Sequence, residues 1–160
     1  MNASPEKQPY TVYISLGSNI QPRRNLPRAI ELLRTLGPVK ALSTIWETPP
    51  VGTAGPNFLN AVACIESQLD VDTLKEKLRQ IETQLGRART ADKYAPRPID
   101  LDILLHDDVL IDPEIWEQPH LAIPLAEVYP DYQHPQRGET IAVAARKFQA
   151  RVQFKPIANL

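Results

Sequence analysis

Residues 87–105, RARTADKYAPRPIDLDILL, carry the pattern on which the predicted fold and the predicted site depend. Residues 99–105 read as a β-strand, on which Asp100 and Asp102 point to one face with their Cα atoms roughly 6.5–7 Å apart. The stretch therefore predicts a strand with one charged face and one buried face. The apolar row of the buried face is Ile99, Leu101, Ile103 and Leu105.

Two carboxylates side by side on a strand repel each other, so a cationic group is expected above them. The preceding segment is rich in turn formers and carries Arg87, Arg89, Lys93 and Arg97. Paired carboxylates suit hard divalent cations such as Mg²⁺, and guanidinium groups suit phosphate oxygens. The stretch thus favours a metal-assisted reaction on a polyphosphate. The alternative is a solvent-facing strand end that follows a charged loop.

The composition is that of an ordinary globular protein, with 160 residues, 42% of them hydrophobic and 23% charged, and a formal net charge of -1. This balance argues against a general nucleic-acid or membrane-surface binder. The sequence shows no membrane-span pattern and no signal-peptide pattern, so a cytoplasmic location is expected. We expect a disordered lead-in over residues 1–9 and one domain over residues 10–160, in which Cys64 is a small buried hydrophobe.

Periodic apolar residues divide the chain before residue 106 into strands and helices. Their order, βαββαβ, is that of the α+β, ferredoxin-like fold, an antiparallel sheet with helices packed on one face. The other face of the sheet and its loops are then free to carry a site. The expected strands are 10–16, 39–47, 58–67 and 99–105, and the expected helices are 23–36 and 71–85.

Four single positions carry further expectations. Because Pro27 is tolerated only near a helix start, the first regular turn of the first helix is expected close to Asn25. Arg79 and Glu82 are expected on the solvated face of the second helix.

Residues after 106 are expected to decorate this fold. Asp107 and Asp108 make a tight turn, and His106 and His134 are expected at the surface. The expected additions are a return strand at 109–111, an extended segment at 118–120, helical segments at 124–129 and 139–148, and a short strand at 151–154.

The loop at residues 48–56 is rich in proline and glycine, and it is either purely structural or contacts a ligand. Asn60, on the strand that follows, stands on a mostly apolar face, where a buried amide must be hydrogen-bonded. It either ties down the preceding loop or binds a ligand, and the sequence leaves both alternatives open.

Six short motifs follow one another along residues 12–130. They are ISLGSN at 14–19, TPPVG at 48–52, FLN at 58–60, GRAR at 86–89, PRPIDLDI at 96–103 and PH at 119–120. Each is weak alone, but the ordered set resembles the 6-hydroxymethyl-7,8-dihydropterin pyrophosphokinase (2-amino-4-hydroxy-6-hydroxymethyldihydropteridine diphosphokinase) family of folate biosynthesis.

The resemblance implies an ATP-dependent diphosphotransferase that transfers pyrophosphate to the hydroxymethyl group of the pterin and releases AMP. It implies two Mg²⁺ ions, held by Asp100 and Asp102, that neutralise the phosphates on both sides of the reacting bond. Asp102 would accept the hydroxyl proton or orient the hydroxyl. Arg87 and Arg97 would complete the catalytic set by clamping phosphates as the loop between them closes.

The resemblance also assigns residues to the two substrates. Tyr94 stands where the family often has a tryptophan that helps to seal the site against water. The implied pterin pocket is Thr48, Pro49, Val51, Phe58 and Asn60, and the implied ATP contacts are Glu82, Arg87, Arg89, Arg97, Ile103 and His120.

One departure from the family pattern follows His120. The family has there a longer segment with a phosphate-contacting arginine and a phenylalanine that stacks on the pterin, whereas here three residues lead directly to a Pro-Leu pair. Loss of the ring contact would cost on the order of 1 kcal/mol beyond area burial. The candidates to cover the pterin instead are Ile123, Trp116 and Tyr94.

This departure motivates one alternative, a degenerate family member that binds nucleotide or pterin without turnover. An RNA-binding ferredoxin-like module is disfavoured, because the strands lack aromatic–basic interleaving and carry two acidic residues. The expected partners are therefore the small-molecule substrates ATP and hydroxymethyl dihydropterin, with no nucleic acid and no membrane, and the protein is expected to be a monomer.

Overall fold

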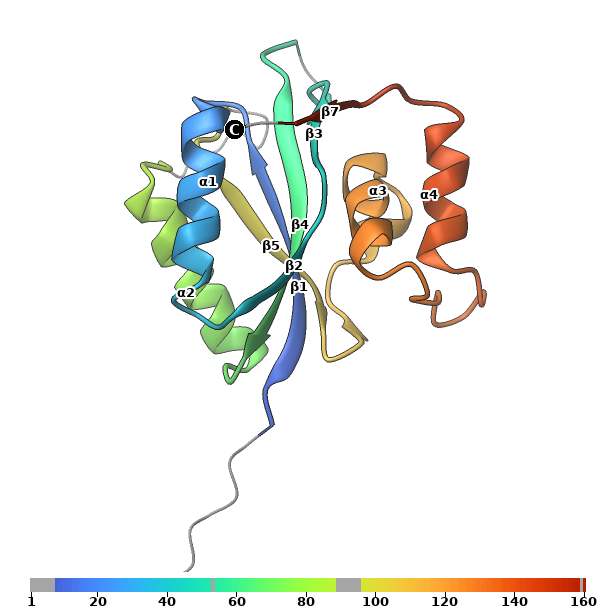
Figure 1. Ribbon diagram of the computed structural model, residues 1–160, viewed down its shortest axis with the longest axis horizontal. Helices are drawn as coiled ribbons and strands as arrows, with labels where there is room; N and C mark the ends of the chain where they lie inside the picture. Colours follow the sequence, from blue (N-terminus) through green and yellow to red (C-terminus); the bar gives the residue numbers. More distant parts are fainter. Residues whose placement is uncertain (1–7, 53, 89–95, 159) are drawn as a thin grey trace, which may run out of the picture.

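The computed structural model describes residues 8–52, 54–88, 96–158 and 160. In this part of the chain one antiparallel sheet lies between two layers of helices (Figure 1). Its strands are β1 (Tyr10–Ser18), β2 (Val39–Leu42), β3 (Ile45–Thr48), β4 (Phe58–Ser67), β5 (Asp100–His106), β6 (Val109–Leu110) and β7 (Lys155–Ile157). The helices are α1 (Pro22–Leu33), α2 (Val71–Gln84), the 3-10 helix η1 (Pro113–Trp116), α3 (Pro119–Val128) and α4 (Ile141–Gln149).

The sheet has seven strands in the order β6-β5-β1-β4-β3-β7, and β2 also pairs with β4. Neighbouring strands are antiparallel. The expected α+β, ferredoxin-like βαββαβ order is confirmed, and the C-terminal additions are helical as predicted. Most of the expected lead-in at residues 1–9 lies outside the described residues.

Helix α1 begins earlier than the proline pattern predicts. Pro22 occupies its first turn, where a missing N–H is tolerated and φ is already helical. The N–H groups of Arg24 and Asn25 close this turn on the carbonyl of Gln21, at 3.0 and 2.9 Å. The expectation of a start near Asn25 is therefore wrong, and Pro27 lies inside the helix.

Helices α1 and α2 pack on one face of the sheet and enclose the first hydrophobic core, as their amphipathic patterns predict (Figure 1). Leu26 and Leu33 of α1 and Leu74 and Leu78 of α2 expose at most 2% of their surface. Burying such a side chain contributes roughly 1.5–3 kcal/mol before the entropy cost. The two leucine stripes therefore hold both helices against the sheet.

The predicted strand at 39–47 is two strands, because the chain breaks between β2 and β3. At the break the N–H of Ser43 donates to the carbonyl of Val62 at 2.9 Å, and Ser43 Oγ accepts from the N–H of Val62 at 2.8 Å. A side-chain oxygen thus takes the place of a backbone acceptor, and the ladder with β4 is interrupted there.

Strand β5 does not keep its predicted alternation to the end. Tyr13 of β1 pairs with Leu105, but the next residue of β1, Ile14, pairs with Ile103, so Leu104 is the extra residue of a β-bulge. The bulge turns Leu105 to the face opposite Ile103. The predicted apolar row therefore ends at Ile103.

His106 follows the bulge and is buried, so its predicted surface position is wrong. Its Nε2 lies 3.0 Å from the carbonyl oxygen of Leu69, and its ring packs on Tyr10 with a centroid distance of 4.4 Å. The other histidine, His134, is half-buried against the ring of Trp116.

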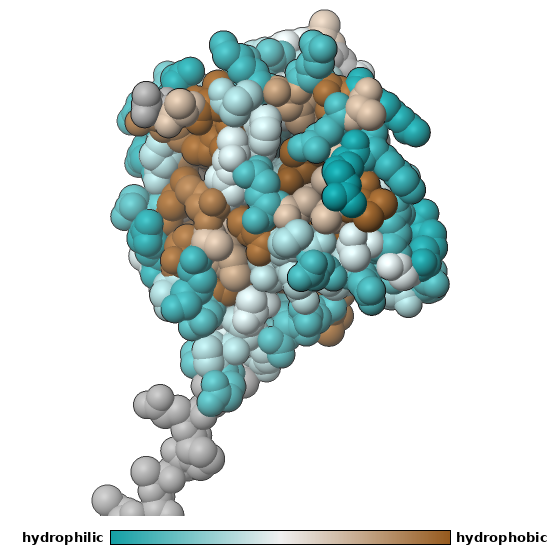
Figure 2. All heavy atoms as spheres, turned by 45° about the vertical axis from the view of Figure 1, so that its right-hand side comes forward, coloured by the Kyte–Doolittle hydropathy of each residue, from teal (hydrophilic) through white to brown (hydrophobic). Residues whose placement is uncertain are grey.

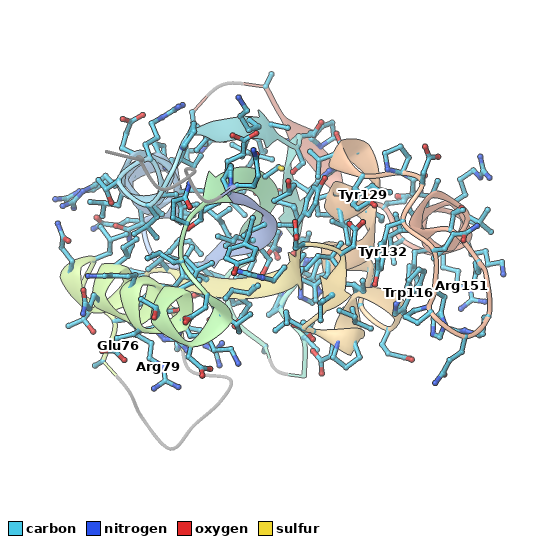
Figure 3. All side chains as sticks on the ribbon, turned by 90° about the horizontal axis from the view of Figure 1, so that it is seen from below. Glu76, Arg79, Trp116, Tyr129, Tyr132 and Arg151 are labelled. Atoms are coloured by element: carbon cyan, nitrogen blue, oxygen red, sulfur yellow. The ribbon has the colours of Figure 1, made fainter. Side chains whose placement is uncertain are left out.

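The helices η1, α3 and α4 cover the opposite face of the sheet (Figure 1) and enclose a second hydrophobic core that the sequence does not predict. Ile115, Leu125 and Ile141 are fully buried in it. The rings of Trp116 and Tyr132 stack there at a centroid distance of 6.0 Å (Figure 3). The C-terminal additions are therefore part of the structural frame of the domain.

The segment 118–120, predicted as extended, contains the start of a helix. Pro119 is the first residue of α3, which continues through Pro124 to Val128. The helical turns predicted at 124–129 are its second half. The last predicted helix agrees with α4, whereas the short strand predicted at 151–154 forms later in the chain, as β7 paired with β3.

Hydrophilic atoms cover most of the right-hand side of the molecule in Figure 2, and hydrophobic atoms emerge between them in patches. Cys64 is buried and forms no disulfide, as predicted. None of the helices in the described ranges has both the length and the apolar character required to cross a bilayer.

Candidate active site

The candidate site lies at the end of the sheet where β1 stops and β4 and β5 begin. The strand register places Gly17 between Asn60 of β4 and Asp100 of β5, and it places Ser15 opposite Asp102. A side chain would not fit at Gly17, since its Cβ would lie 2.8 Å from Asn60 Oδ1. Glycine therefore allows polar groups from two strands to converge over the end of β1.

Both oxygens of the Asp100 carboxylate are held by arginines. Arg87 Nη1 donates to Oδ1 at 2.7 Å, and Arg97 Nη1 donates to Oδ2 at 2.9 Å. The side chains of Arg87 and Arg97 are 15% and 25% exposed, so both ion pairs are partly buried. The cationic group expected next to the paired carboxylates is thus a pair of guanidinium groups.

Glu82, predicted on the solvated face of α2, is instead the buried partner of Arg87. Its Oε2 accepts from Arg87 Nη1 at 2.6 Å and from the backbone N–H of Leu101 at 2.9 Å. With 3% of its surface exposed, this carboxylate requires such partners. Burial alone would lower the pKa of Arg87, but the charges of Asp100 and Glu82 outweigh it, and the net shift is upward.

The backbone of Arg97 is fixed to the turn that follows β1. Asn19 Oδ1 accepts from the N–H of Arg97 at 2.6 Å, and the N–H of Asn19 donates to the Arg97 carbonyl at 3.0 Å. Asn19, the last residue of the ISLGSN motif, is only 8% exposed. The Arg97 guanidinium group therefore stands on an anchored backbone.

Asp102 lies beside Asp100 on the floor of a cavity. It is accessible to solvent through the cavity, yet protein surrounds it on the other sides. This desolvation, together with the charges of Asp100, Asp112 and Glu82, raises the pKa of Asp102 to about 7. A bound cation would favour the ionised form. Asp112, which follows β6, has no predicted role in the sequence analysis.

Asp100 and Asp102 suit a Mg²⁺ ion that takes only one or two of its ligands from the protein. This ion is commonly bound through one or two carboxylates together with substrate phosphates and water. Within the described ranges, no group of three or more His, Cys, Asp or Glu side chains has metal-binding geometry. The donor set therefore fits an ion that brings a phosphate ligand with it.

A cavity of about 550 Å³ opens in front of these carboxylates. Asn60 Nδ2 donates to Thr48 Oγ1 at 2.6 Å beside it, so the amide ties down the loop and also faces the cavity. Arg97 and His120 line the same cavity. All five residues of the implied pterin pocket line it as well: Thr48, Pro49, Val51, Phe58 and Asn60.

A second cavity, of about 320 Å³, adjoins the first, and Asp100, Asp102 and Asp112 line both. Of the residues implied for ATP, Glu82, Arg87 and Ile103 line this smaller cavity.

Arg79 is exposed on α2, as predicted, and it also lines the smaller cavity. Figure 3 shows it projecting from α2 beside Glu76. Arg89 and Tyr94 lie outside the described residues.

A hollow of about 660 Å³ at the opposite end of the sheet, between α1 and α2, is lined by residues such as Leu36, Gln68 and Gln84. None of the residues of the carboxylate–arginine cluster line this hollow. The candidate active site is therefore not assigned to it, although its volume exceeds those of the two cavities at the cluster.

The end wall of the larger cavity is the first turn of α3. His120 and Leu121 line the cavity there. Burial lowers the pKa of His120 despite the opposing charges of Asp100 and Asp112, which favours a neutral imidazole.

Two of the three side chains expected to cover the pterin ring, Trp116 and Ile123, do not form this wall, and the third, Tyr94, lies outside the described residues. Trp116 is buried in the second core, and Ile123 is 2% exposed and does not line the cavity. Leu121, which the sequence analysis does not single out, is the apolar side chain that α3 presents to it.

Fold and site together define a ferredoxin-like α+β protein with a carboxylate–arginine cluster of a kind suited to polyphosphates. The chain belongs to the 7,8-dihydro-6-hydroxymethylpterin-pyrophosphokinase (HPPK) family, whose model matches residues 13–130. A Porphyromonas gingivalis 2-amino-4-hydroxy-6-hydroxymethyldihydropteridine pyrophosphokinase is 37% identical over 139 residues, covering 78% of this chain and 94% of the relative. A Pseudomonas aeruginosa protein of the same name is 34% identical over 136 residues, covering 78% and 83%.

Solved structures agree with the fold. A Plasmodium falciparum HPPK-DHPS structure matches with a TM-score of 0.73 at 14% sequence identity, covering 93% of this chain and 45% of that one. The chain thus spans less than half the length of that protein, and the likeness supports the fold alone.

Proposed function

We propose that the protein transfers pyrophosphate from ATP to 6-hydroxymethyl-7,8-dihydropterin, giving AMP and the pterin diphosphate, in folate biosynthesis. Family membership supports this reaction. The observation that carries its assignment to this site is the meeting of two cavities at Asp100, Asp102 and Asp112. Substrates bound on either side of one carboxylate cluster would present their reacting groups to each other.

In this proposal the larger cavity takes the pterin. Its volume of about 550 Å³ suits a small ring system. Phe58 and Leu121 offer apolar surface, while the Asn60 amide, whose Nδ2 is engaged by Thr48, presents its oxygen as an acceptor. Apolar walls with one fixed amide would orient a planar heterocycle.

The smaller cavity takes part of the nucleotide. Ile103 and Ile111 offer apolar surface there, and Arg87 lines this cavity while it donates to Asp100. Arg87 and Arg97 would then flank the phosphate chain, which guanidinium groups bind in bidentate fashion. A contact from Arg89 stays a prediction.

Asp100 and Asp102 would hold Mg²⁺, which when bound neutralises phosphate charge. The count of two ions stays a prediction. Asp102 would orient the attacking hydroxyl or take up its proton, and a bound cation would keep this carboxylate ionised for either role. Arg87 and Arg97 would stabilise the charge that spreads over the transferred phosphates as the β-phosphorus is attacked.

The test is the identity of the nucleotide product. The protein incubated with ATP, Mg²⁺ and the pterin should release AMP and the pterin diphosphate. Asp102→Asn should lower the rate by at least about 10²-fold with an unchanged circular-dichroism spectrum, whereas exposed Asp131→Asn should keep full turnover. Release of ADP, or no nucleotide product, would contradict the proposal.

The alternative of a degenerate, non-catalytic family member has no specific observation in its favour. Arg87 and Arg97 pair with Asp100, and Asp102 lines the same two cavities as Asp100. We further propose a cytoplasmic monomer that acts on these two small molecules. Its location and oligomeric state stay predictions.

A further inference from the structure

Asp100 stands between the two cavities and is approached by one arginine from each. Arg97 lines the larger cavity and Arg87 lines the smaller one. Each donates to a different oxygen of the same carboxylate, at 2.9 and 2.7 Å. In this arrangement the carboxylate expected to bind a metal ion already has a guanidinium group on each oxygen.

The two arginines are anchored through groups other than Asp100. The N–H of Arg87 donates to the carbonyl of Glu82 at 3.0 Å, and its guanidinium group also holds the buried Glu82 carboxylate. Arg97 is anchored by its pair of backbone bonds to Asn19. Rotation of the long side chains can therefore change the partner of each guanidinium group without movement of β5 or of the turn after β1.

Charge balance favours simultaneous binding of the metal ion and the nucleotide phosphates at Asp100 and its two arginines. A divalent ion that arrives alone meets a guanidinium group on each oxygen of Asp100 and must compete with both or lie next to them, which opposes binding. A metal–nucleotide complex instead offers phosphate oxygens to the guanidinium groups while its metal takes the carboxylate. Each charge then keeps a partner of opposite sign, and no partly buried charge is left unpaired.

We propose that Arg87 and Arg97 guard Asp100, so that the site excludes a free divalent cation and accepts the metal only together with the nucleotide phosphates. This inference rests on the proposed function for the nature of the nucleotide. It makes Arg97 a residue with two opposite effects: it weakens binding of the bare metal and strengthens binding of the metal–nucleotide complex.

A purely structural role for Arg97 leads to a different expectation. If its ion pair only fixed the start of β5, removal would disorder Asp100 and weaken both kinds of binding. The sign of the change in bare-metal affinity therefore separates the two roles.

The experiment measures Mn²⁺ binding by the full chain, from the electron paramagnetic resonance signal of the free ion. We expect Arg97→Ala to bind Mn²⁺ alone on the order of fivefold more tightly than the wild type, because one repelling charge is removed. The same variant should bind Mn²⁺ with a nonhydrolysable ATP analogue on the order of tenfold more weakly, because a phosphate contact is lost.

Arg28→Ala is the matched control, since Arg28 is exposed on α1 and its removal changes the net charge equally. It should alter neither affinity. Arg97→Gln repeats the test in a side chain of similar length if the alanine variant does not fold. Arg87 is less suitable, because its removal would leave the buried Glu82 without its cation.

Unchanged or weaker binding of Mn²⁺ alone to both Arg97 variants would overturn the proposal. Opposite changes in the two affinities would support it even in a protein that released no AMP. Release of AMP without opposite changes would leave the proposed reaction standing and reject the simultaneous binding.

Discussion

Gly17 shows at the scale of one residue how the larger cavity keeps its shape. A Cβ there would meet Asn60 Oδ1 at 2.8 Å and push the amide away from its 2.6 Å bond to Thr48. Overpacking of this kind costs about 1–3 kcal/mol. We therefore expect Gly17→Ala to lower the free energy of unfolding in urea and to raise KM for the pterin more than KM for ATP.

A double-mutant cycle identifies the cause of that effect. In the Asn60→Ala background the opposing oxygen is gone, so Gly17→Ala should cost much less there than in the wild type. Equal costs in both backgrounds would show that the contact with Asn60 Oδ1 is not the cause.

The protonation of His120, in the wall of the larger cavity, makes the free energy of unfolding depend on pH. Burial lowers its pKa in the folded protein below the ordinary value of 6.5, so below that pH the unfolded chain binds the proton more readily. The stabilisation from neutral His120 is therefore present above pH 6.5 and is lost as the pH falls toward the folded pKa. We expect its Cε1–H resonance to titrate with a midpoint below 6.5 in nuclear magnetic resonance spectra.

His120→Gln assigns this resonance by removing it. The variant should also show a smaller fall in unfolding free energy between about pH 6.5 and 5, because the linked proton is gone. A His120 signal that titrated at or above 6.5 would contradict the expected burial effect.

Single residues of the site differ in how far sequence alone can place them. Asp100 and Asp102 are predictable neighbours, because the period of a strand is local. The partner of Arg87 depends on how α2 packs beside β5, which the sequence does not state. One signal was available, since Glu82 continues the i+4 series of Leu74 and Leu78 and therefore belongs to the buried stripe.

At the scale of elements, α3 is braced at its far end by Glu127. Glu127 Oε2 accepts from the N–H and the hydroxyl of Thr44 at 3.1 and 2.6 Å, and Oε1 accepts from Trp46 Nε1 at 2.7 Å. Thr44 directly precedes β3 and Trp46 lies within it, and this strand ends at Thr48 in the larger cavity. One carboxylate thus connects the strand that carries Thr48 to the helix that carries His120.

We expect Glu127→Ala to lower the free energy of unfolding by about 1 kcal/mol, because three donors lose an exposed acceptor. It should also raise KM for the pterin with little change in kcat, while Glu127→Gln, which keeps one acceptor oxygen, should recover part of both losses. Glu76→Ala on the outer side of α2 is the control (Figure 3). A loss of stability with an unchanged KM for the pterin would show that the Glu127 contacts do not influence the larger cavity.

Elements with uninterrupted periodicity are the ones that sequence predicts well. Strands β1 and β4 and helix α2 match their patterns closely, because apolar spacing alone decides them. The break between β2 and β3 depends on the Ser43 side chain, which no periodicity reveals. The start of α3 is hidden because Pro119 reads as extended chain, although proline at the first helical position costs nothing.

At the scale of the whole molecule, the described residues form two cores that share one sheet, and the second could not be predicted from periodicity. The apolar residues of α3 and α4 need partners on the sheet, and the bulge in β5 supplies them by placing both Leu104 and Leu105 on that face. A strand without the bulge would have sent Leu105 into the first core. A local irregularity thus decides whether the C-terminal helices decorate the fold or complete it.

Two buried residues, one from each core, test whether the second layer controls the site. Ile141 of α4 and Leu33 of α1 are each 0% exposed, so Ile141→Ala and Leu33→Ala should each cost about 2–5 kcal/mol. Because the cores share the sheet, we expect one unfolding transition in which circular dichroism and tryptophan fluorescence coincide, with Trp116 reporting on the second core.

The pterin KM should nevertheless separate these variants at equal stability. Helix α4 packs on α3, whose first turn carries His120 and Leu121 into the larger cavity, so Ile141→Ala should raise KM for the pterin and Leu33→Ala should not. Steady-state kinetics well below both unfolding temperatures measures this difference. Equal increases in KM would mean that reduced stability of the whole domain, rather than the position of α3, lowers pterin affinity. In the unfolding experiment, a fluorescence transition of Ile141→Ala that preceded the circular-dichroism transition would mean that the second layer unfolds on its own.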